Sequence, residues 1–600
     1  MNRMKKILLA TCIASAALLS ACVDLDLAPL SEGSSETWYS SQSEIEMSLN
    51  DFYRTDFFPI LDKSWGDDVT WRNNTQAVQN GTMTAEDGTV ANRWQNFYKG
   101  IARALRLLGK MDNARAMGIS EADITQYEGE AYFYLGYAYG MLAFFWGDAI
   151  LDKTGMTLDE AYQAVRSPKA DVLEYAYKCF DEAANRLPTT YSGIQRATKG
   201  AALAFKARMA LWNGDYDVAA DAAKLCMGLG IYKLHDNYQD LFTASWSDEW
   251  IFFFRGDVTL KKYYFAAADV NNIVPRLVGG WGGVCAPSYE LICAYPCTDG
   301  KPIDESPLYN PKDPFENRDP RLAMTVVPFA TAYTKSVLDG TYKPEDYGWL
   351  GYEHSPDPTR TQVTNLSTGE LISNTDSKAR AEHAAYNGFM FKKYVDESWL
   401  ENGHNGAPTT YPYLRYGDVL LMYAEAMNEL GECDQEVLDL TINELRKRAY
   451  RGTGIDYPVA TVGSQQAMRT MIRTERFIEM AFEGWRYPDL LRWRLAEVIF
   501  NRPTYYLKRA WSGSASWDGN EQNVSDDYKV LIQNWKDGNY PIGGTPQIDE
   551  NGLADLQYMV DAGYIVIAAE RKFDASRDYL WPVPADDRLI NDKLDQNPNW

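Results

Sequence analysis

Two short clusters around residue 70 place a tryptophan beside side chains that form strong hydrogen bonds with hydroxyl groups. They are Trp65-Gly66-Asp67-Asp68 and Trp71-Arg72-Asn73-Asn74. The C–H face of a sugar ring packs on an aromatic ring, while Asp, Asn and Arg side chains bind its hydroxyl groups. We therefore predict a sugar-contact site built from Trp65, Asp67, Asp68, Trp71, Arg72 and Asn73. The competing interpretation gives the tryptophans to the core and the polar residues to turns and helix caps.

A second aromatic cluster lies in the middle of the chain. Trp281 stands between glycine pairs in the segment 279–283, and Tyr289 follows eight residues later. The four glycines free the backbone around Trp281, so this ring can present a face to a ligand. We predict that Trp281 and Tyr289 add to the same kind of site, with burial in the core as the alternative.

Catalysis is the rival use of such residues. Glycoside hydrolysis needs two carboxylates about 5–10 Å apart, and Asp67 with Asp68 is the most suggestive pair. Nothing in its spacing marks an acid and a base, and the sequence has no Gly-x-Ser-x-Gly, His-Glu-x-x-His or Walker motif. The four histidines are widely separated. We expect no enzymatic activity, no cofactor and no metal site.

Three cysteines lie close together in the central part of the chain. Cys285, Cys293 and Cys297 are near enough in sequence for a local disulfide, and Cys293 with Cys297 is the pair that we name as its candidate. Zinc is the competing interpretation, but the spacing is not that of a zinc motif and no histidine lies nearby.

The N-terminus has the pattern of a bacterial export signal. Basic residues at positions 3, 5 and 6 precede an apolar run that ends in Leu19-Ser20-Ala21-Cys22. This run is too short to span a bilayer of about 30 Å. The triplet before Cys22 resembles a lipobox, so we predict cleavage after residue 21 and lipidation of Cys22.

The chain is strongly acidic. Loss of residues 1–21 removes three basic residues and takes the net charge from −24 to −27. Such a field repels nucleic acids and anionic lipids, and it disfavours polyanionic ligands unless a local basic patch overrides it. We therefore expect no nucleic-acid partner and a neutral ligand.

Helical periodicity fills most of the remaining sequence. Successive helices are predicted at 172–187, 198–212 and 216–227, while an uncharged run from 131 to 146 predicts a buried core helix. These helix pairs indicate a mainly α, tetratricopeptide-like solenoid. The expected organisation is a signal peptide at 1–21, a tether at 22–42 and a single domain at 43–600. Within it we place helical repeats at about 43–230 and 413–500, a loop-rich insertion at about 231–412 and a loop-rich C-terminal segment at 501–600.

Several motifs resemble, in order, those of the SusD/RagB outer-membrane lipoproteins of Bacteroidota. They are Asp299–Ile303, Asn317–Leu322, Arg415–Ala426, Ile442–Ala449, Glu475–Glu479, Phe482–Trp493, Trp581–Pro584 and Gln596–Pro598. One departure is Pro488, where the family usually has Phe. The residue types in these motifs favour buried arginine–carboxylate contacts between helices, and Arg415 with Asp418 could pair on one helix face.

The resemblance implies a tetratricopeptide-like fold with a loop-rich insertion, and ligand sites drawn from an early loop and the insertion. It also implies a lid on a SusC-like TonB-dependent transporter that captures a nutrient, usually a glycan. Cys22 would anchor the protein in the outer membrane, and the acidic residues that follow it resemble a signal for export to the cell surface. Two alternatives stay open, which are a RagB-like protein that captures peptides or proteins and a structural lid without a ligand.

Overall fold

The computed structural model describes residue 39 and residues 41–600, with gaps inside this range. The gaps are residues 73–74, 192–195, 276–277, 281–282, 331–349, 358–359, 377–386, 403–405, 508–525, 527–528, 530–531, 534–536 and 538–543. The predicted signal peptide, nearly all of the tether, Cys22, Asn73 and Trp281 therefore lie outside the described residues.

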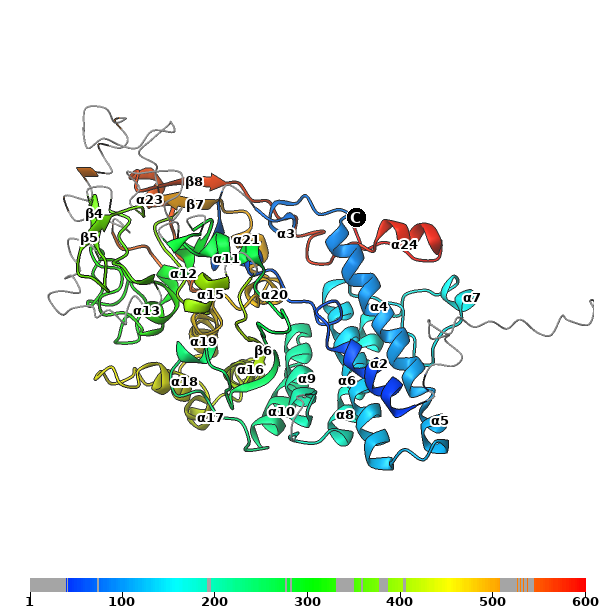
Figure 1. The fold of residues 1–600 in the computed structure, drawn as a ribbon. Coiled ribbons are helices and arrows are strands. Elements are labelled where there is room, and N and C mark those ends of the chain that lie inside the picture. The colour runs from blue at the N-terminus through cyan, green and yellow to red at the C-terminus, as the bar shows by residue number, and fades with distance from the viewer. Residues whose placement is uncertain are drawn as a thin grey trace, which may run out of the picture.

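Long helices packed side by side form the N-terminal part of the fold (Figure 1). They are α2 (Gln42–Phe52), α4 (Gly88–Leu108), α5 (Met111–Ala116), α6 (Glu121–Phe145), α8 (Lys169–Arg186), α9 (Lys199–Asn213) and α10 (Tyr216–Met227), with the short α3 (Ala77–Asn80) and α7 (Leu158–Ala161). Hydroxyl side chains cap α6 and α9, where Ser120 and Thr198 accept backbone N–H groups. The three predicted helices between 172 and 227 are confirmed as α8, α9 and α10.

Helix α6 is the centre of this helical part. It contacts α2, α4, α5, α8 and α9, and nearly all residues from 129 to 145 are buried. Surrounded on all sides, the helix has no face that needs charged residues, and the predicted core helix is confirmed. Within the described part of the chain, no helix is both long and apolar enough to cross a membrane.

A second group of helices follows residue 410 and packs on the first. It contains α16 (Tyr416–Leu430), α17 (Gln435–Leu440), α18 (Ile442–Ala449), α19 (Gln465–Glu479), α20 (Arg486–Arg492) and α21 (Ala496–Ile499). Helix α16 contacts α10 on one side and α19 on the other, so it joins the two groups. The predicted mainly α, tetratricopeptide-like fold is confirmed.

The chain between the two groups consists of loops with short elements. These are η2 (Asp240–Phe242), β2 (Trp250–Phe254), α11 (Ala267–Ile273), β3 (Cys285–Pro287), α12 (Tyr289–Ala294), α13 (Arg321–Thr325), β4 (Gln362–Thr364), β5 (Leu371–Ser373), α15 (Glu397–Asn402) and β6 (Tyr411–Arg415). Strand β2 pairs antiparallel with β6, with Trp250 opposite Arg415. The two ends of this segment therefore meet directly in front of α16.

The remaining strands make three more antiparallel pairs. The pairs are β4 with β5, β7 (Thr504–Leu507) with β8 (Ile565–Ala569), and β1 (Val69–Trp71) with β3. Two short helices, α23 (Gln557–Asp561) and α24 (Ala585–Ile590), belong to the C-terminal segment. This segment returns to the first helical group, because the indole N–H of Trp146 donates to the Pro582 carbonyl at 2.9 Å.

The helical repeats predicted at about 413–500 are interrupted between α19 and α20. Phe482 and Gly484 have positive φ angles of 62° and 83°, and such backbone ends a helix. The turn places Glu483 in the interior, where it meets Arg415.

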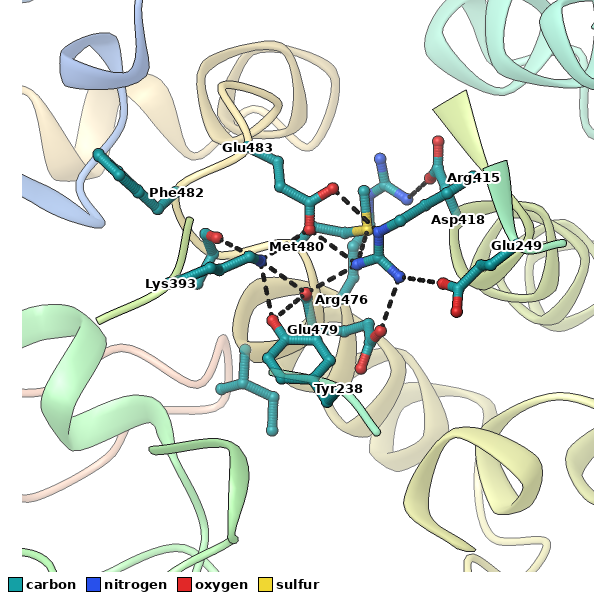
Figure 2. Close-up of polar contacts among 12 residues, drawn as sticks. Tyr238, Glu249, Lys393, Arg415, Asp418, Arg476, Glu479, Met480, Phe482 and Glu483 are labelled. Atoms are coloured by element: carbon teal, nitrogen blue, oxygen red, sulfur yellow. Dashed lines mark hydrogen bonds and ion pairs between the residues drawn. The ribbon is translucent and has the colours of Figure 1, made fainter. Parts of the chain in front are cut away.

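Arg415 is the centre of a buried group of charges (Figure 2). Its guanidinium donates to Glu249 at 2.8 Å, to Glu479 at 2.8 Å and to Glu483 at 2.7 Å. Lys393 donates at 2.8 Å to the Oε1 of Glu483, the same oxygen that accepts from Arg415 Nη2. These side chains are fully buried. The cluster connects β2, β6, α19 and the turn after α19.

Each carboxylate in the cluster is matched by a cation. Burial alone would raise the pKa of Glu479, but Arg448, Arg415 and Arg321 outweigh this effect and hold its pKa low. Burial lowers the pKa of Lys393 to about 8, although Glu483 opposes this shift. The cluster is therefore stable only while all of its charges are present.

The predicted buried arginine–carboxylate contacts are confirmed, but one pairing is different. Asp418 does not pair with Arg415. It accepts hydrogen bonds from Arg208 at 2.5 Å and from Arg476 at 2.5 Å, while Arg415, at the end of β6, is drawn to Glu479 and Glu483. The sequence spacing placed Arg415 on α16, whereas it ends the preceding strand.

Replacing Arg415 by alanine should destabilise the protein strongly. The change leaves Glu249, Glu479 and Glu483 buried with too few cations, and breaking a buried charge pair costs about 3–5 kcal/mol. We expect a loss of this size in the free energy of unfolding, measured by urea denaturation and circular dichroism.

The matched control is Arg115→Ala. Arg115 also contacts three carboxylates, Asp112, Glu121 and Glu128, but at the surface. Its removal should leave the unfolding midpoint almost unchanged. Equal losses for the two variants would contradict a structural role for the buried cluster.

Candidate functional site

A cleft of about 410 Å³ lies between the first helical group and the loop-rich segment. It is lined by η1 (Lys63–Trp65), by Trp71 at the end of β1, by Thr89 and Arg93 of α4, and by residues from the loop-rich segment. Those residues are Tyr264, Phe265, Asp269, Ile273 and Cys285, and Phe482 closes one side. Trp65 and Trp71, two of the predicted ligand residues, thus share one cavity.

Local backbone contacts explain why the two tryptophans meet there. Asp62 caps η1 by accepting the Ser64 N–H at 2.9 Å, and β1 then pairs with β3 so that Trp71 lies opposite Cys285. The β1–β3 pairing therefore brings the early loop and the central segment, from which the resemblance implies ligand sites, next to each other.

The two tryptophans differ in how much of the ring is available. Trp65 is buried, with its ring edge-to-face against Tyr487 and Trp581. The guanidinium of Arg93 lies 5.0 Å from its centroid. Trp71 is half-buried against the core. Trp71 is therefore the ring better placed to stack on a ligand, while Trp65 forms part of the wall.

Two cations in the cleft were not predicted. The Lys63 ammonium lies 4.3 Å from the centroid of Phe265 and 4.9 Å from that of Tyr411, and its side chain has no hydrogen bond with the described residues. Burial lowers its pKa, with Asp269 and Asp62 opposing the shift. Arg93 has a buried Nη1 that lacks a hydrogen-bond partner in the described part. No local pattern marks them, because their partners come from distant segments.

Asp67 and Asp68 are buried beneath the cleft and do not line it. Asp67 accepts two hydrogen bonds from Arg486, at 2.6 and 3.1 Å, and Asp68 accepts the Phe482 N–H at 2.8 Å. A Cβ at Gly66 would lie 2.3 Å from the Asp68 carboxylate, so only glycine fits there. Asp67 attaches the loop to α20, and Asp68 attaches it to the turn before α20. These structural roles differ from the turn and helix-cap roles that were the alternative to ligand contact.

The other predicted residues have mixed positions. Tyr289 is completely buried, and its hydroxyl donates to the Asn387 carbonyl at 3.0 Å, so it is a core residue away from the cleft. Arg72 continues the β1–β3 pairing through its N–H, which donates to Val284 at 2.9 Å. Asn73 and Trp281 lie outside the described residues.

The candidate disulfide between Cys293 and Cys297 is not present. Both are free thiols, as are the other four cysteines in the described residues. Cys293 lies in α12, whereas Cys297 has left the helix, forms a bridge with Arg318 and contacts Ser306.

A larger cavity lies elsewhere, and its chemistry is different. It has about 600 Å³ and lies between α12, α19 and residues 548–552. None of the described residues that line it is aromatic. A site for stacking on a ring is therefore better formed by the smaller cleft.

Paired helices crossed by a loop-rich segment, with an aromatic cleft between them, define a tetratricopeptide-like helical fold of the SusD class. The model of the SusD family matches residues 253–600, and a second model, described as starch-binding associating with outer membrane, matches residues 42–211. The chain belongs to the SusD family.

Individual relatives are similar to this chain over different shares of its length. SusD-like protein P2 of Formosa agariphila is 23% identical over 513 residues, which cover 80% of this chain and 90% of the relative. A SusD-like protein of Bacteroides ovatus is 28% identical over 253 residues, which cover 38% and 46% of the two chains. A crystal structure of a SusD-like carbohydrate binding protein from Bacteroides fragilis has a TM-score of 0.66 at 25% identity, and covers 93% of this chain and all of that one.

Asp68 should make stability depend on pH. Burial raises the pKa of its carboxyl group to about 6, although the Phe482 N–H opposes the shift. The folded state then holds a proton that the unfolded state releases, so this contribution to stability falls as the pH rises from about 4 to about 6. A difference of about two in pKa between the folded and unfolded states corresponds to about 3 kcal/mol in the free energy of unfolding.

We expect Asp68→Asn to remove most of this pH dependence, because the amide cannot ionise. The measurement is urea unfolding of both proteins at about pH 4 and about pH 7, with the exposed Asp112→Asn as control for the loss of one negative charge. A constant stability difference between Asp68→Asn and the natural protein at both pH values would contradict the shifted pKa.

Proposed function

We propose that the protein is a cell-surface lipoprotein that captures oligosaccharides or polysaccharides and delivers them to a SusC-like TonB-dependent outer-membrane transporter. The observation that carries this proposal is the cleft that contains Trp65, Trp71 and Lys63. Family membership supports it, as do the descriptions of two relatives. One is called a carbohydrate binding protein, and another structure, 17% identical, is described as being with xylogluco-oligosaccharide.

The cleft has the chemistry that a sugar requires. Trp71 offers a partly exposed aromatic face, and a volume of about 410 Å³ lies within the range of small-ligand pockets. The Lys63 ammonium forms no hydrogen bond with the described residues, so it can donate to a ligand. Asp62, Asp269 and Thr89 add acceptors to the lining of the same cleft. Donors and acceptors of both charges balance within the cleft, and such a set suits the hydroxyl groups of a neutral sugar.

Binding rather than catalysis is the proposed activity. The carboxylates that could have formed an acid and base pair, Asp67 and Asp68, are bonded to Arg486 and to the Phe482 backbone. Trp281 and Asn73 stay in the proposed ligand site, because they adjoin β3 and β1 in the sequence.

Replacing Trp71 by alanine should weaken glycan binding. Loss of a central aromatic contact costs about 2 kcal/mol, which is roughly thirtyfold in affinity. Isothermal titration against a panel of neutral oligosaccharides measures the effect, and Trp281→Ala is expected to act in the same direction.

The matched control is Trp246→Ala, since this tryptophan is 48% exposed, lies edge-to-face against Phe253 and does not line the cleft. Its removal should leave affinity unchanged. Binding of basic peptides with no neutral glycan bound would favour peptide capture. Normal uptake after Trp71→Ala and Trp281→Ala would favour a lid without a ligand of its own.

Replacing Cys22 by alanine should release the protein from the membrane without affecting the fold. Lipid chains on this residue are the proposed anchor, so membrane fractionation should find the variant in the soluble fraction. Purified variant should bind glycan as before, while uptake by cells should fail. Uptake that survives the change would contradict a need for the anchor at the transporter.

A further inference from the structure

A second cavity lies at the opposite end of α20 and shares no lining residue with the cleft. It has about 330 Å³ and is formed where the ends of α6, α9 and α20 meet the start of α8 and the C-terminal segment. Its charged and aromatic lining residues include Lys169, Arg492, Arg494, Arg577, Trp212 and Tyr579.

The charge of this cavity is opposite to that of the chain. Four cations and no carboxylate occur among the described residues that line it, although the chain carries a net charge of −24. Arg492 pairs with Glu425 and Asp489, and Arg577 pairs with Asp578. The local basic patch that could override the acidic field is therefore present here.

The other two cations have no such partners. The side chains of Lys169 and Arg494 make no ion pair or hydrogen bond with any described residue. The carboxylates that attract the Lys169 ammonium through space are those of Asp215 and Asp148. Asp215 accepts the Tyr177 hydroxyl at 2.6 Å and Asp148 accepts the Lys169 backbone N–H at 2.8 Å, and neither forms an ion pair with the Lys169 ammonium. Two positive charges thus remain for an external anion.

A buried donor without an acceptor also points to a ligand. Trp212 lines the cavity and is 3% exposed, and its indole N–H has no partner in the described part. Buried tryptophan N–H groups are normally hydrogen-bonded. An acceptor oxygen inside the cavity would satisfy this group.

Arg494 occupies a position that usually takes glycine. The Leu495 N–H donates to Leu490 at 2.9 Å and the Arg494 N–H to Leu491 at 3.1 Å, which closes α20 in a Schellman motif. Arg494 itself has a φ of 58°, a conformation that is unfavourable for residues with a Cβ. Its guanidinium stacks 3.5 Å from the centroid of Tyr579, at the cavity. An arginine in this unfavourable conformation is consistent with a role for its charge in binding an anion.

We propose that this cavity binds the carboxylate or sulfate group of an acidic sugar. Lys169, Arg494 and the Trp212 N–H contact the oxyanion, while Phe144 and Tyr579 pack against the ring. The volume lies at the lower end of the range for small ligands. The identity of the ligand as a sugar rests on the proposed function, but the anion site does not use the Trp71 cleft.

The test is titration of the mature full-length protein with D-glucuronate and D-galacturonate, with glucose and galactose as neutral counterparts and inorganic sulfate as the bare anion. We expect the uronates to bind more tightly than the neutral sugars, with affinity falling as salt rises. Arg494→Gly and Lys169→Met should each weaken uronate binding at least about tenfold, the loss expected for one charge-assisted hydrogen bond.

Arg494→Gly also separates binding from folding, because glycine favours the αL position and should preserve or raise the melting temperature. The exposed Arg451→Ala removes one charge elsewhere and should leave uronate affinity unchanged. Equal affinity for uronate and its neutral counterpart, equal affinity for sulfate and uronate, or no loss in Arg494→Gly would overturn the proposal. Failure of neutral glycans to bind, with uronate binding intact, would count against the Trp71 cleft alone.

Discussion

The buried charge cluster around Arg415 is the constraint on which the rest of the molecule depends. Removing these charges from water is costly, so the cluster is favourable only when every carboxylate has its cation. This requirement fixes the turn after α19, because Glu483 must reach both Arg415 and Lys393. Phe482, the preceding residue, is then held with its N–H on Asp68 and its ring near Lys63. One wall of the ligand cleft is thus a direct consequence of charge pairing in the core.

Much of the fold could be predicted from the sequence, and part of the site. Helical periodicity located α8, α9 and α10, and an uncharged run correctly indicated a core helix because α6 is surrounded by other helices. Trp65 and Trp71, which were predicted as ligand contacts, line the same cleft. The roles of Asp67 and Asp68 could not be predicted, since their partners Arg486 and Phe482 are more than 400 residues away. Lys63 was missed for the same reason, because its aromatic neighbours belong to distant segments.

The net charge and the local charge of this protein lead to different conclusions about the ligands that it can bind. The overall value of −24 predicts the long-range field, which salt screens within about 8 Å at physiological ionic strength. A ligand inside a cavity instead responds to the groups that touch it. The Trp71 cleft is lined by charges of both signs, whereas the charged residues among the described lining of the cavity beside Arg494 are all cations. The same acidic chain can therefore bind a neutral ligand in one cavity and an acidic ligand in the other.

Helix α20 lines the cavity beside Arg494 and begins beneath the Trp71 cleft, yet its contacts argue for two independent sites. Its first residue, Arg486, is bonded to Asp67 beneath the cleft, and its last, Arg492, is bonded to Glu425 and Asp489 beside the second cavity. Asp489 also accepts from Arg476 at 2.8 Å. Energetic coupling between sites requires an element with two alternative arrangements. A short helix whose charged residues are all paired, most of them in the interior, has no second arrangement of comparable energy, so occupation of one cavity should leave the affinity of the other unchanged.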